Sequence, residues 1–321
     1  ALPILMLARD EGKISSMVFV DLSKAFDCVL HQRLIDELGS IGLRSTALKW
    51  FMQYLSGRSQ SVGCGSGAGQ TTSCSRGVPQ GSVLGPLLFA LYTRLLPDSV
   101  DVECQLFADD ILLHCSSFQS HSVTSDLTVA VSALNTWLDD RGLRMNIGKT
   151  KAMFIVPPRK EVPGDLKVTC CGNPLATVCA YRYLGVVIDN QLRWNEHINS
   201  VIAKASQKIG ALRRAGQRMT VATRRAYYLS VIQADLEYGS NAFYTSLSAA
   251  NKDKLCRIAK RAIRAIISAP PWTHTDPLHA SLRICPILKR LEEKLLVLTH
   301  RCTHNLTSSL LCNQYELRDR K

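Results

Sequence analysis

Short hydrophobic runs alternate with helical patterns along the first part of the chain. The apolar, β-rich run at 17–20 predicts a buried strand that ends at Asp21, and similar runs predict strands at 103–108 and 111–115. Elsewhere hydrophobic residues recur at three- and four-residue spacing, which places them on one face of a helix. The expected helices are 25–38, 46–55, 83–95 capped by Ser82, and 120–141, and the other expected strands are 151–156, 166–170 and 182–188.

After residue 190 the pattern changes to helices alone. Helical spacing predicts helices at 196–214, 220–234, 249–268 and 286–305, with Pro270-Pro271 as a break. We therefore expect an α+β fold. A first domain at 1–190 contains the strands, and an all-α domain at 191–321 comes after it.

Composition and charge separate the same two parts of the chain. Of the 321 residues, 46% are hydrophobic and 20% are charged, as in globular proteins. The longest apolar run, 83–92, is too short for a membrane span, which needs about 20 residues. The net charge of +13 divides into +1 for residues 1–188 and +12 for residues 189–321. The basic part indicates a nucleic-acid partner, and a solvated basic helical domain is the competing interpretation.

Three carboxylates stand at the ends of predicted strands. Asp21 ends the first strand, and Asp109 and Asp110 lie at the tip of a predicted hairpin. If the first strand lies beside that hairpin, Asp21 comes next to Asp109, where the acids repel each other unless a cation neutralises them. Mg²⁺ suits such oxygen ligands, and two ions about 4 Å apart can clamp the oxygens of a phosphoryl transfer. For an isolated Asp-Asp pair, a polar turn is the simpler interpretation.

Five short motifs in order decide between these interpretations. The segments are FVDLSKAFD at 19–27, GVPQGS at 77–82, FADD at 107–110, LRMNIGKTK at 143–151 and YLG at 183–185. Together they resemble the five palm motifs of reverse transcriptases, and their wording is similar to that of non-LTR (LINE-type) retrotransposons. The resemblance spans about residues 15–190. The segment LEYG at 236–239 is also similar to the region after the palm in these elements.

The resemblance implies a polymerase-type palm, an antiparallel sheet with packed helices, followed by a basic thumb-like helical domain. It implies an RNA-directed DNA polymerase that adds deoxynucleotides to the 3′-hydroxyl of a DNA primer on an RNA template. Two Mg²⁺ ions, with Mn²⁺ as a substitute, are the expected cofactors. Asp21 and Asp109 are the expected direct metal ligands and Asp110 a more peripheral one. Lys149 is expected to assist the leaving pyrophosphate, with a solvated lysine as the alternative.

The same resemblance assigns binding roles to four further groups of residues. Phe26 is expected to block the sugar 2′-hydroxyl, although a core residue is the alternative. The turn Pro79-Gln80-Gly81 is expected to approach the template and the nucleotide. Tyr183, Leu184 and Gly185 match the primer grip. Beyond the motifs, one face of a predicted helix is expected to contact nucleic-acid phosphates through Arg257, Lys260, Arg261 and Arg264.

Only about 15 residues precede the first motif, so the fingers are expected to be largely absent. We expect the chain to be part of a longer polyprotein that also carries an endonuclease, to act in the nucleus, and to polymerise weakly or not at all alone. A non-catalytic transposon relic or RNA-binding module is the alternative. A nucleotidyl cyclase-like palm is a third, against which the GVPQG motif and the basic helices argue. The cysteines lack the paired C-x2-C spacing of zinc sites.

Overall fold

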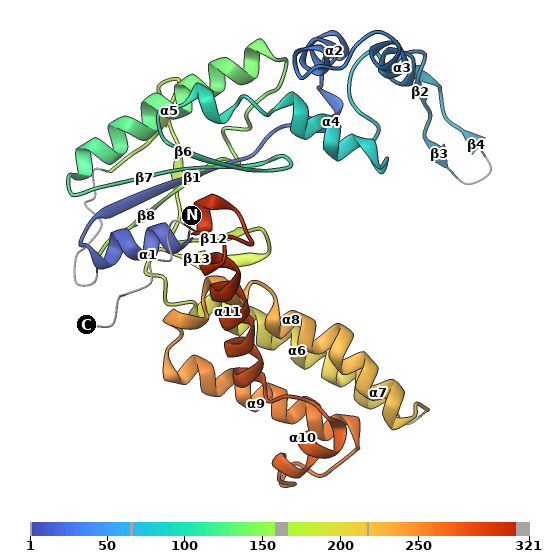
Figure 1. Cartoon of the computed structure of the whole chain (residues 1–321), viewed down its shortest axis with the longest axis vertical. Coiled ribbons are helices and arrows are strands. Elements are labelled where there is room, and N and C mark those ends of the chain that lie inside the picture. Colours follow the sequence, from blue (N-terminus) through green and yellow to red (C-terminus); the bar gives the residue numbers. More distant parts are fainter. Residues whose placement is uncertain (1, 65–66, 158–165, 217, 313–321) are drawn as a thin grey trace. The chain divides into compact units, whose positions relative to one another are not determined.

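The computed structural model describes residues 2–64, 67–157, 166–216 and 218–312 (Figure 1). The chain forms two compact units, which we describe separately. The first is Ala8–Cys179, and the second is Ala180–Lys321 together with Leu2–Leu7, which belong to helix α1 (Leu2–Asp10). The segment 180–189, which the sequence pattern placed in the first domain, belongs to the second unit because it packs on a helix there.

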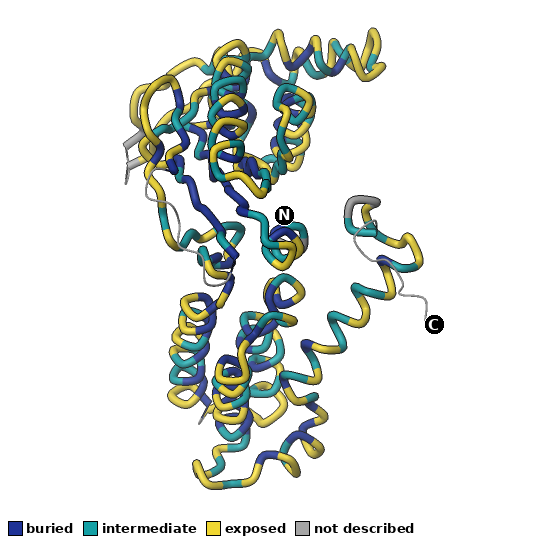
Figure 2. The backbone as a smooth tube through the Cα atoms, turned by 90° about the vertical axis from the view of Figure 1, so that its left-hand side faces the viewer, coloured by how far each residue is buried: buried dark blue, intermediate teal, exposed yellow. Residues whose placement is uncertain are grey.

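A five-stranded sheet forms the centre of the first unit. The strand order is β11 (Ala176–Thr177), β8 (Lys151–Ile155), β1 (Ile14–Val20), β7 (Asp110–Ser117) and β6 (Glu103–Phe107). Only the short edge strand β11 pairs in parallel with its neighbour among the strands of this sheet. All seven residues of β1 are buried, as expected for a strand covered on both faces (Figure 2). These pairings confirm the predicted first strand and hairpin.

Helices pack on this sheet and beside it. Helix α5 (Ser120–Asp140) packs on β1 and β7 and buries Leu127, Val131 and Leu134 at helical spacing. Helix α2 (His31–Ser40) packs against α3 (Thr46–Leu55) and α4 (Leu84–Tyr92). The Ser82 hydroxyl accepts a hydrogen bond from the Gly85 N–H at 2.9 Å, so Ser82 caps the start of α4 as predicted. The remaining elements of this unit are α2 (His31–Ser40), α3 (Thr46–Leu55), α4 (Leu84–Tyr92), a 3₁₀ turn at Pro97–Ser99, and the strand pairs β2 (Ser59–Gln60) with β5 (Thr72–Ser73), β3 (Gly63–Cys64) with β4 (Gly67–Ala68), and β9 (Thr169–Cys170) with β10 (Asn173–Pro174).

The helix predicted at 25–38 is wrong in its first half. Residues Ala25–Asp27 form one 3₁₀ turn, and the α-helix begins only at His31. The carbonyl of Phe26 accepts a hydrogen bond from the Val78 N–H at 2.8 Å, and that of Val29 accepts one from the Gly77 N–H at 2.7 Å. These two carbonyls therefore serve a distant loop instead of a continuous helix.

The second unit begins with a hairpin and continues with helices. Strands β12 (Ala180–Tyr183) and β13 (Val186–Asp189) form the hairpin, so the single strand predicted at 182–188 is wrong. Leu184 and Gly185 form its turn, with φ values of +46° and +81°. The helices are α6 (Asn195–Gly216), α7 (Val221–Tyr227) continuing through a π-helical segment at Tyr228–Gln233 into α8 (Ala234–Glu237), α9 (Ala249–Ile266), α10 (Asp276–Leu282), α11 (Ile287–Thr303) and α12 (Ser309–Cys312), with 3₁₀ turns at Ser240–Ala242 and Tyr244–Ser246.

The four predicted C-terminal helices are confirmed, whereas the short helix α10 was not predicted. Its seven residues contain a proline and begin soon after Pro270-Pro271, so they carry little periodic signal. Among the described helices, none combines the length and the apolar character that crossing a bilayer requires.

Candidate active site

The three predicted carboxylates lie together at one end of the interior strands β1 and β7. We call this end of the five-stranded sheet the sheet edge. In the register of β1 and β7, Val20 is opposite Ile111, so Asp21 comes directly after the last residue of β1, beside the start of β7. Phe107 pairs with Asp110, which leaves Ala108 and Asp109 as a two-residue turn. Ala108 has a φ of +53°, the region that such turns require and that L-residues other than Gly, Asn and Asp rarely occupy. The fold therefore uses a locally strained turn to present Asp109.

The loop at 144–150 holds Asp21 from the other side of β1. The Asn146 N–H donates to the Asp21 carbonyl at 2.8 Å, and the Asp21 N–H donates to Thr150 Oγ1 at 3.3 Å. The same loop brings Lys149 Nζ to 3.9 Å from Asp21 Oδ2. The Lys149 side chain is 72% exposed, so this ion pair contributes little to stability. Lys149 is thus close to Asp21, and its side chain is exposed to solvent.

The electrostatics of the acids fit a divalent cation. The pKa of Asp110 is raised, first by partial burial and then by the carboxylates of Asp109 and Asp21. In the part of the chain that the structure describes, no three His, Cys, Asp or Glu side chains converge into a metal-binding group. Mg²⁺ in phosphoryl-transfer sites commonly takes one or two carboxylates and completes its shell with substrate phosphates and water. The donor set at this edge of the sheet suits that mode of binding.

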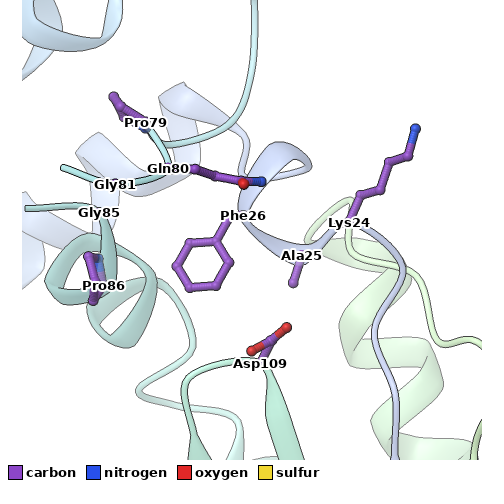
Figure 3. A pocket seen from close by; sticks show the side chains of 9 residues that line it. All are labelled: Lys24, Ala25, Phe26, Pro79, Gln80, Gly81, Gly85, Pro86 and Asp109. Atoms are coloured by element: carbon purple, nitrogen blue, oxygen red, sulfur yellow. The ribbon is translucent and has the colours of Figure 1, made fainter. Parts of the chain in front are cut away.

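A cavity of about 360 Å³ opens beside Asp109 (Figure 3). The Phe26 ring lies between Gln80 and the Asp109 carboxylate, whereas the Lys24 side chain points away. Phe26 stacks on Phe89, with ring centroids 4.6 Å apart, so its ring is held in place. The cavity is lined by Lys24, Ala25, Phe26, Pro79, Gln80, Gly81, Gly85, Pro86 and Asp109. Residues of three of the predicted motifs therefore line one hollow. Asp110 and Lys149 are not among its lining residues.

The loop at 77–82 is tied closely to the turn that carries Phe26. Gly77 has a φ of +89°, and a Cβ there would lie 2.9 Å from the Asp27 Cα, so only glycine fits. Gln80 Nε2 donates to Asp27 Oδ1 at 2.9 Å. Asp27 thus accepts a hydrogen bond from the neighbouring loop, and Gln80 keeps its amide oxygen available at the cavity.

A second cavity, of about 720 Å³, lies against Pro79 and Gln80. Its lining is rich in cationic and hydroxyl side chains, which suits a polyanion. They are Lys24, Arg58, Arg76, Ser59, Ser73 and Ser75, and His31 and Asp27 also line the cavity. The sequence pattern gave no sign of this cavity, because the pairing of β2 with β5, not a local motif, brings Arg58 and Arg76 together.

The predicted primer-grip residues lie at the tip of the β12–β13 hairpin in the second unit. The Tyr238 hydroxyl donates to the Leu184 carbonyl at 2.8 Å. A Cβ on Gly185 would lie 3.0 Å from the Tyr238 ring, and one on Gly239 would lie 2.7 Å from Val186 Cγ2. The backbone at Gly185 therefore packs against the Tyr238 side chain, and the backbone at Gly239 packs against the Val186 side chain. Tyr238 had no predicted role, although it lies in the LEYG segment that resembles the region after the palm.

The predicted basic face of α9 is only partly presented to solvent. Arg257, Lys260 and Arg261 are exposed, and Arg257 forms an ion pair with Asp253 one turn earlier. Arg264 is half-buried, and its Nε donates to the Thr273 carbonyl at 2.8 Å. Arg264 therefore points into the unit rather than along the exposed face.

A family model described as "Reverse transcriptase (RNA-dependent DNA polymerase)" matches residues 5–188. The chain belongs to the reverse transcriptase family. The match covers all the motif residues of the first unit and ends within the β12–β13 hairpin of the second. The family predicted from the five motifs is therefore confirmed.

Relatives of this reverse transcriptase come from a mobile element and a transposon of Drosophila. The RNA-directed DNA polymerase from mobile element jockey of Drosophila funebris is 25% identical over 297 residues, which are 89% of this chain and 32% of the relative. The probable RNA-directed DNA polymerase from transposon BS of Drosophila melanogaster is 26% identical over 292 residues, or 87% and 32%. These relatives confirm the resemblance to LINE-type elements. The chain spans about a third of the length of these two curated relatives.

Solved structures give a weaker likeness. Telomerase from Candida tropicalis, in complex with a fragment of telomeric RNA, has a TM-score of 0.40 and 11% sequence identity, over 92% of this chain and 50% of that one.

Proposed function

We propose that the first unit is the palm of an RNA-directed DNA polymerase from a non-LTR retrotransposon, and that the second unit is its thumb. The main support is that Asp109, Phe26 and Gln80, from three separate motifs, line one cavity at the sheet edge where Asp21 also lies. The reaction is the addition of a deoxynucleotide to the 3′-hydroxyl of a primer paired with an RNA template.

Asp21 and Asp109 would hold two Mg²⁺ ions, with Asp110 at the periphery and Mn²⁺ as a substitute. When bound, such ions activate the attacking hydroxyl and neutralise charge on the transferred phosphoryl group and on the leaving pyrophosphate. The raised pKa of Asp110, caused by burial and by its neighbouring acids, supports cation binding at this edge. Lys149, exposed and next to Asp21, supplies a positive charge or a proton to the pyrophosphate.

The cavity of Figure 3 would take the incoming nucleotide. The Phe26 ring, fixed by its stack on Phe89, occupies the space that a sugar 2′-hydroxyl needs. Pro79, Gln80 and Gly81 form the wall against which the new base pair lies. The basic cavity on Gln80 would hold the template strand, because its cationic and hydroxyl groups suit a phosphate backbone.

The second unit would hold the primer and the duplex. Tyr183, Leu184 and Gly185 are the proposed primer grip, and the exposed residues Arg257, Lys260 and Arg261 contact phosphates. The aligned regions cover 89% and 87% of this chain but only 32% of each relative. We therefore propose that the active enzyme is a longer polyprotein that includes an endonuclease. The chain alone is then weak or inactive, and the nucleus is its proposed place of action.

Primer extension on an RNA template tests this function. The full-length protein should extend a DNA primer with Mg²⁺, and Asp109→Asn should abolish extension, because the substitution removes a metal ligand. Asp140→Asn, which neutralises an exposed acid on α5, is the matched control and should extend as the wild type does. Extension by the Asp109→Asn variant at the wild-type rate would contradict the metal assignment.

The alternative of a non-catalytic RNA-binding module predicts a different result. Such a module binds a primer–template duplex in a salt-dependent way, yet the full-length protein shows no extension under any metal condition. Robust extension by the 321-residue chain alone would instead contradict the proposal that it is only part of the active enzyme.

A further inference from the structure

The second unit gathers positive charge without acids at one end of its helical bundle. Between Glu196 and Asp235 the sequence contains seven Lys or Arg residues and no acid, and between Asp253 and Asp276 it contains five and no acid. Helices α6 and α9 carry much of these two stretches and pack against each other (Figure 1). The fold therefore brings two acid-free basic stretches side by side, and like charges repel unless an anion lies among them.

A cavity of about 300 Å³ lies where these stretches meet. Three arginines line it, namely Arg213 near the end of α6, Arg224 in α7 and Arg264 near the end of α9. Its other lining residues are apolar or hydroxyl-bearing, and none is acidic. Among the described residues, no carboxylate forms an ion pair with any of the three arginines.

Arg224 is held in place but is not satisfied by the protein. One of the terminal nitrogens of Arg224 donates to the Ser268 hydroxyl at 2.7 Å. Gly216 leaves room for the Arg224 side chain, since a Cβ at position 216 would lie 3.0 Å from Arg224 Cδ. Its Nε is buried and has no hydrogen-bond partner in the described part of the chain. A buried donor without a partner is costly, and a guanidinium fork matches the paired oxygens of a phosphate group.

We propose that the cavity lined by Arg213, Arg224 and Arg264 binds one phosphate group of a nucleic-acid strand. Arg224 contacts the phosphate through its fork, Arg213 and Arg264 supply the flanking charge, and the Ser268 hydroxyl positions Arg224. The geometry of the site is independent of the proposed function. Only the source of the phosphate, a primer–template duplex, rests on that function. It differs from the exposed face at Arg257, Lys260 and Arg261, because it is a cavity sized for a single phosphate and contains a buried donor, Arg224 Nε.

The test compares duplex binding by variants that each change one basic residue. Fluorescence anisotropy with a labelled RNA–DNA duplex is measured for the 321-residue chain over a range of salt. Arg213→Gln and Arg224→Lys should each weaken binding about tenfold, since one loses a charge and the other loses the fork. Lys204→Gln removes an exposed charge from α6 outside the cavity and should cost about twofold or less.

Inorganic phosphate supplies the second arm. It should raise the melting temperature of the wild type and of Lys204→Gln, but not that of Arg224→Lys. Equal losses of duplex affinity in all variants would overturn the site in favour of diffuse charge. Phosphate protection that depends on Arg224, with duplex binding unchanged by Arg213→Gln and Arg224→Lys, would overturn the nucleic acid as its ligand. Neither readout uses primer extension, so an inactive polymerase with the expected binding pattern would contradict the proposed function and leave this site supported.

Discussion

Single residues at two hairpin turns, one in each unit, have backbone geometry that their own residue types do not favour. Ala108 has a positive φ in the turn that presents Asp109, and Leu184 has one at the tip of the β12–β13 hairpin. A non-glycine residue in this region costs roughly 1 kcal/mol or more, so the surrounding pairing must stabilise it. Strain of this kind is typical of sites where a side chain must be aimed.

The turn at Ala108 gives a stability prediction. Ala108→Gly should raise the local stability of the β6–β7 hairpin by up to about 1 kcal/mol, because glycine accepts a positive φ without strain. Ala108→Val should lower it by more than that, since a β-branched residue resists this conformation. Hydrogen exchange of the β6 and β7 amides measures both changes. Faster exchange in the glycine variant than in the wild type would show that the turn is not strained.

The Phe26 ring gives a specificity prediction. Phe26→Val in the full-length enzyme should raise the use of ribonucleotides relative to deoxynucleotides by about tenfold or more, because the smaller side chain leaves space for a 2′-hydroxyl. Single-nucleotide insertion kinetics with matched nucleotide pairs give the ratio. Phe118→Val, at an exposed ring outside the cavity, is the control. An unchanged ratio in the Phe26 variant would assign that ring to packing alone.

At the scale of elements, the β12–β13 hairpin depends on the end of helix α8. Tyr238 bonds to the hairpin turn, and the preceding Glu237 is buried between Arg290 and Lys294 of α11. Burial alone would raise the pKa of Glu237, but hydrogen bonds from Lys294, Gln233 and Arg290 hold it below its ordinary value. Helix α11 therefore supports the hairpin through α8.

Tyr238→Phe tests this support. Losing the hydroxyl removes one hydrogen bond to the Leu184 carbonyl, so primer affinity should fall roughly two- to tenfold while the maximal rate of extension stays near wild type. The separation of primer KM from kcat distinguishes a positioning role from a general loss of folding. Tyr227→Phe in α7 is the matched control. A lower kcat with an unchanged primer KM would contradict the role.

At the scale of the whole molecule, each unit carries a buried histidine that burial keeps neutral. Burial lowers the pKa of His114 on β7 to about 4. It does the same for His197 on α6, where Arg182 and Lys204 add to the effect. The unfolded chain takes up these protons near the ordinary value of 6.5, before the folded chain does. Stability is therefore complete above that value and is lost as the pH falls from 6.5 toward 4.

Acid unfolding checks this prediction. The free energy of unfolding should fall by roughly 1–3 kcal/mol per histidine between pH 6.5 and pH 4. His114→Gln and His197→Gln should each flatten the pH dependence, whereas His121→Gln, at an exposed position, should not. A pH dependence that both buried variants leave unchanged would assign acid sensitivity to the carboxylates instead.

The sequence predicts what is local and misses what long-range contacts decide. The strand ending at Asp21, the hairpin carrying Asp109 and the motif residues around Gln80 are encoded in short segments, and so were predictable. The break in the helix at 25–38 was not, because its cause is a hydrogen bond from Gly77 to a distant carbonyl. The hairpin turn was hidden by a leucine at a position that usually holds asparagine or glycine. The arginine cavity of the second unit forms only when three helices meet.

The hydrogen bonds from Gly77 and Val78 to the turn that carries Phe26 have a consequence for fidelity. Phe26, the proposed test of the sugar, and Gln80, the proposed contact to the base pair, lie on two segments that are hydrogen-bonded to one another, and Gln80 itself donates to Asp27. If the site closes onto a nucleotide, these bonds favour movement of both segments together. Selectivity for the deoxyribose sugar and selectivity for the correctly paired base should therefore be coupled. A mutation that breaks the hydrogen bonds between these two segments should lower both selectivities.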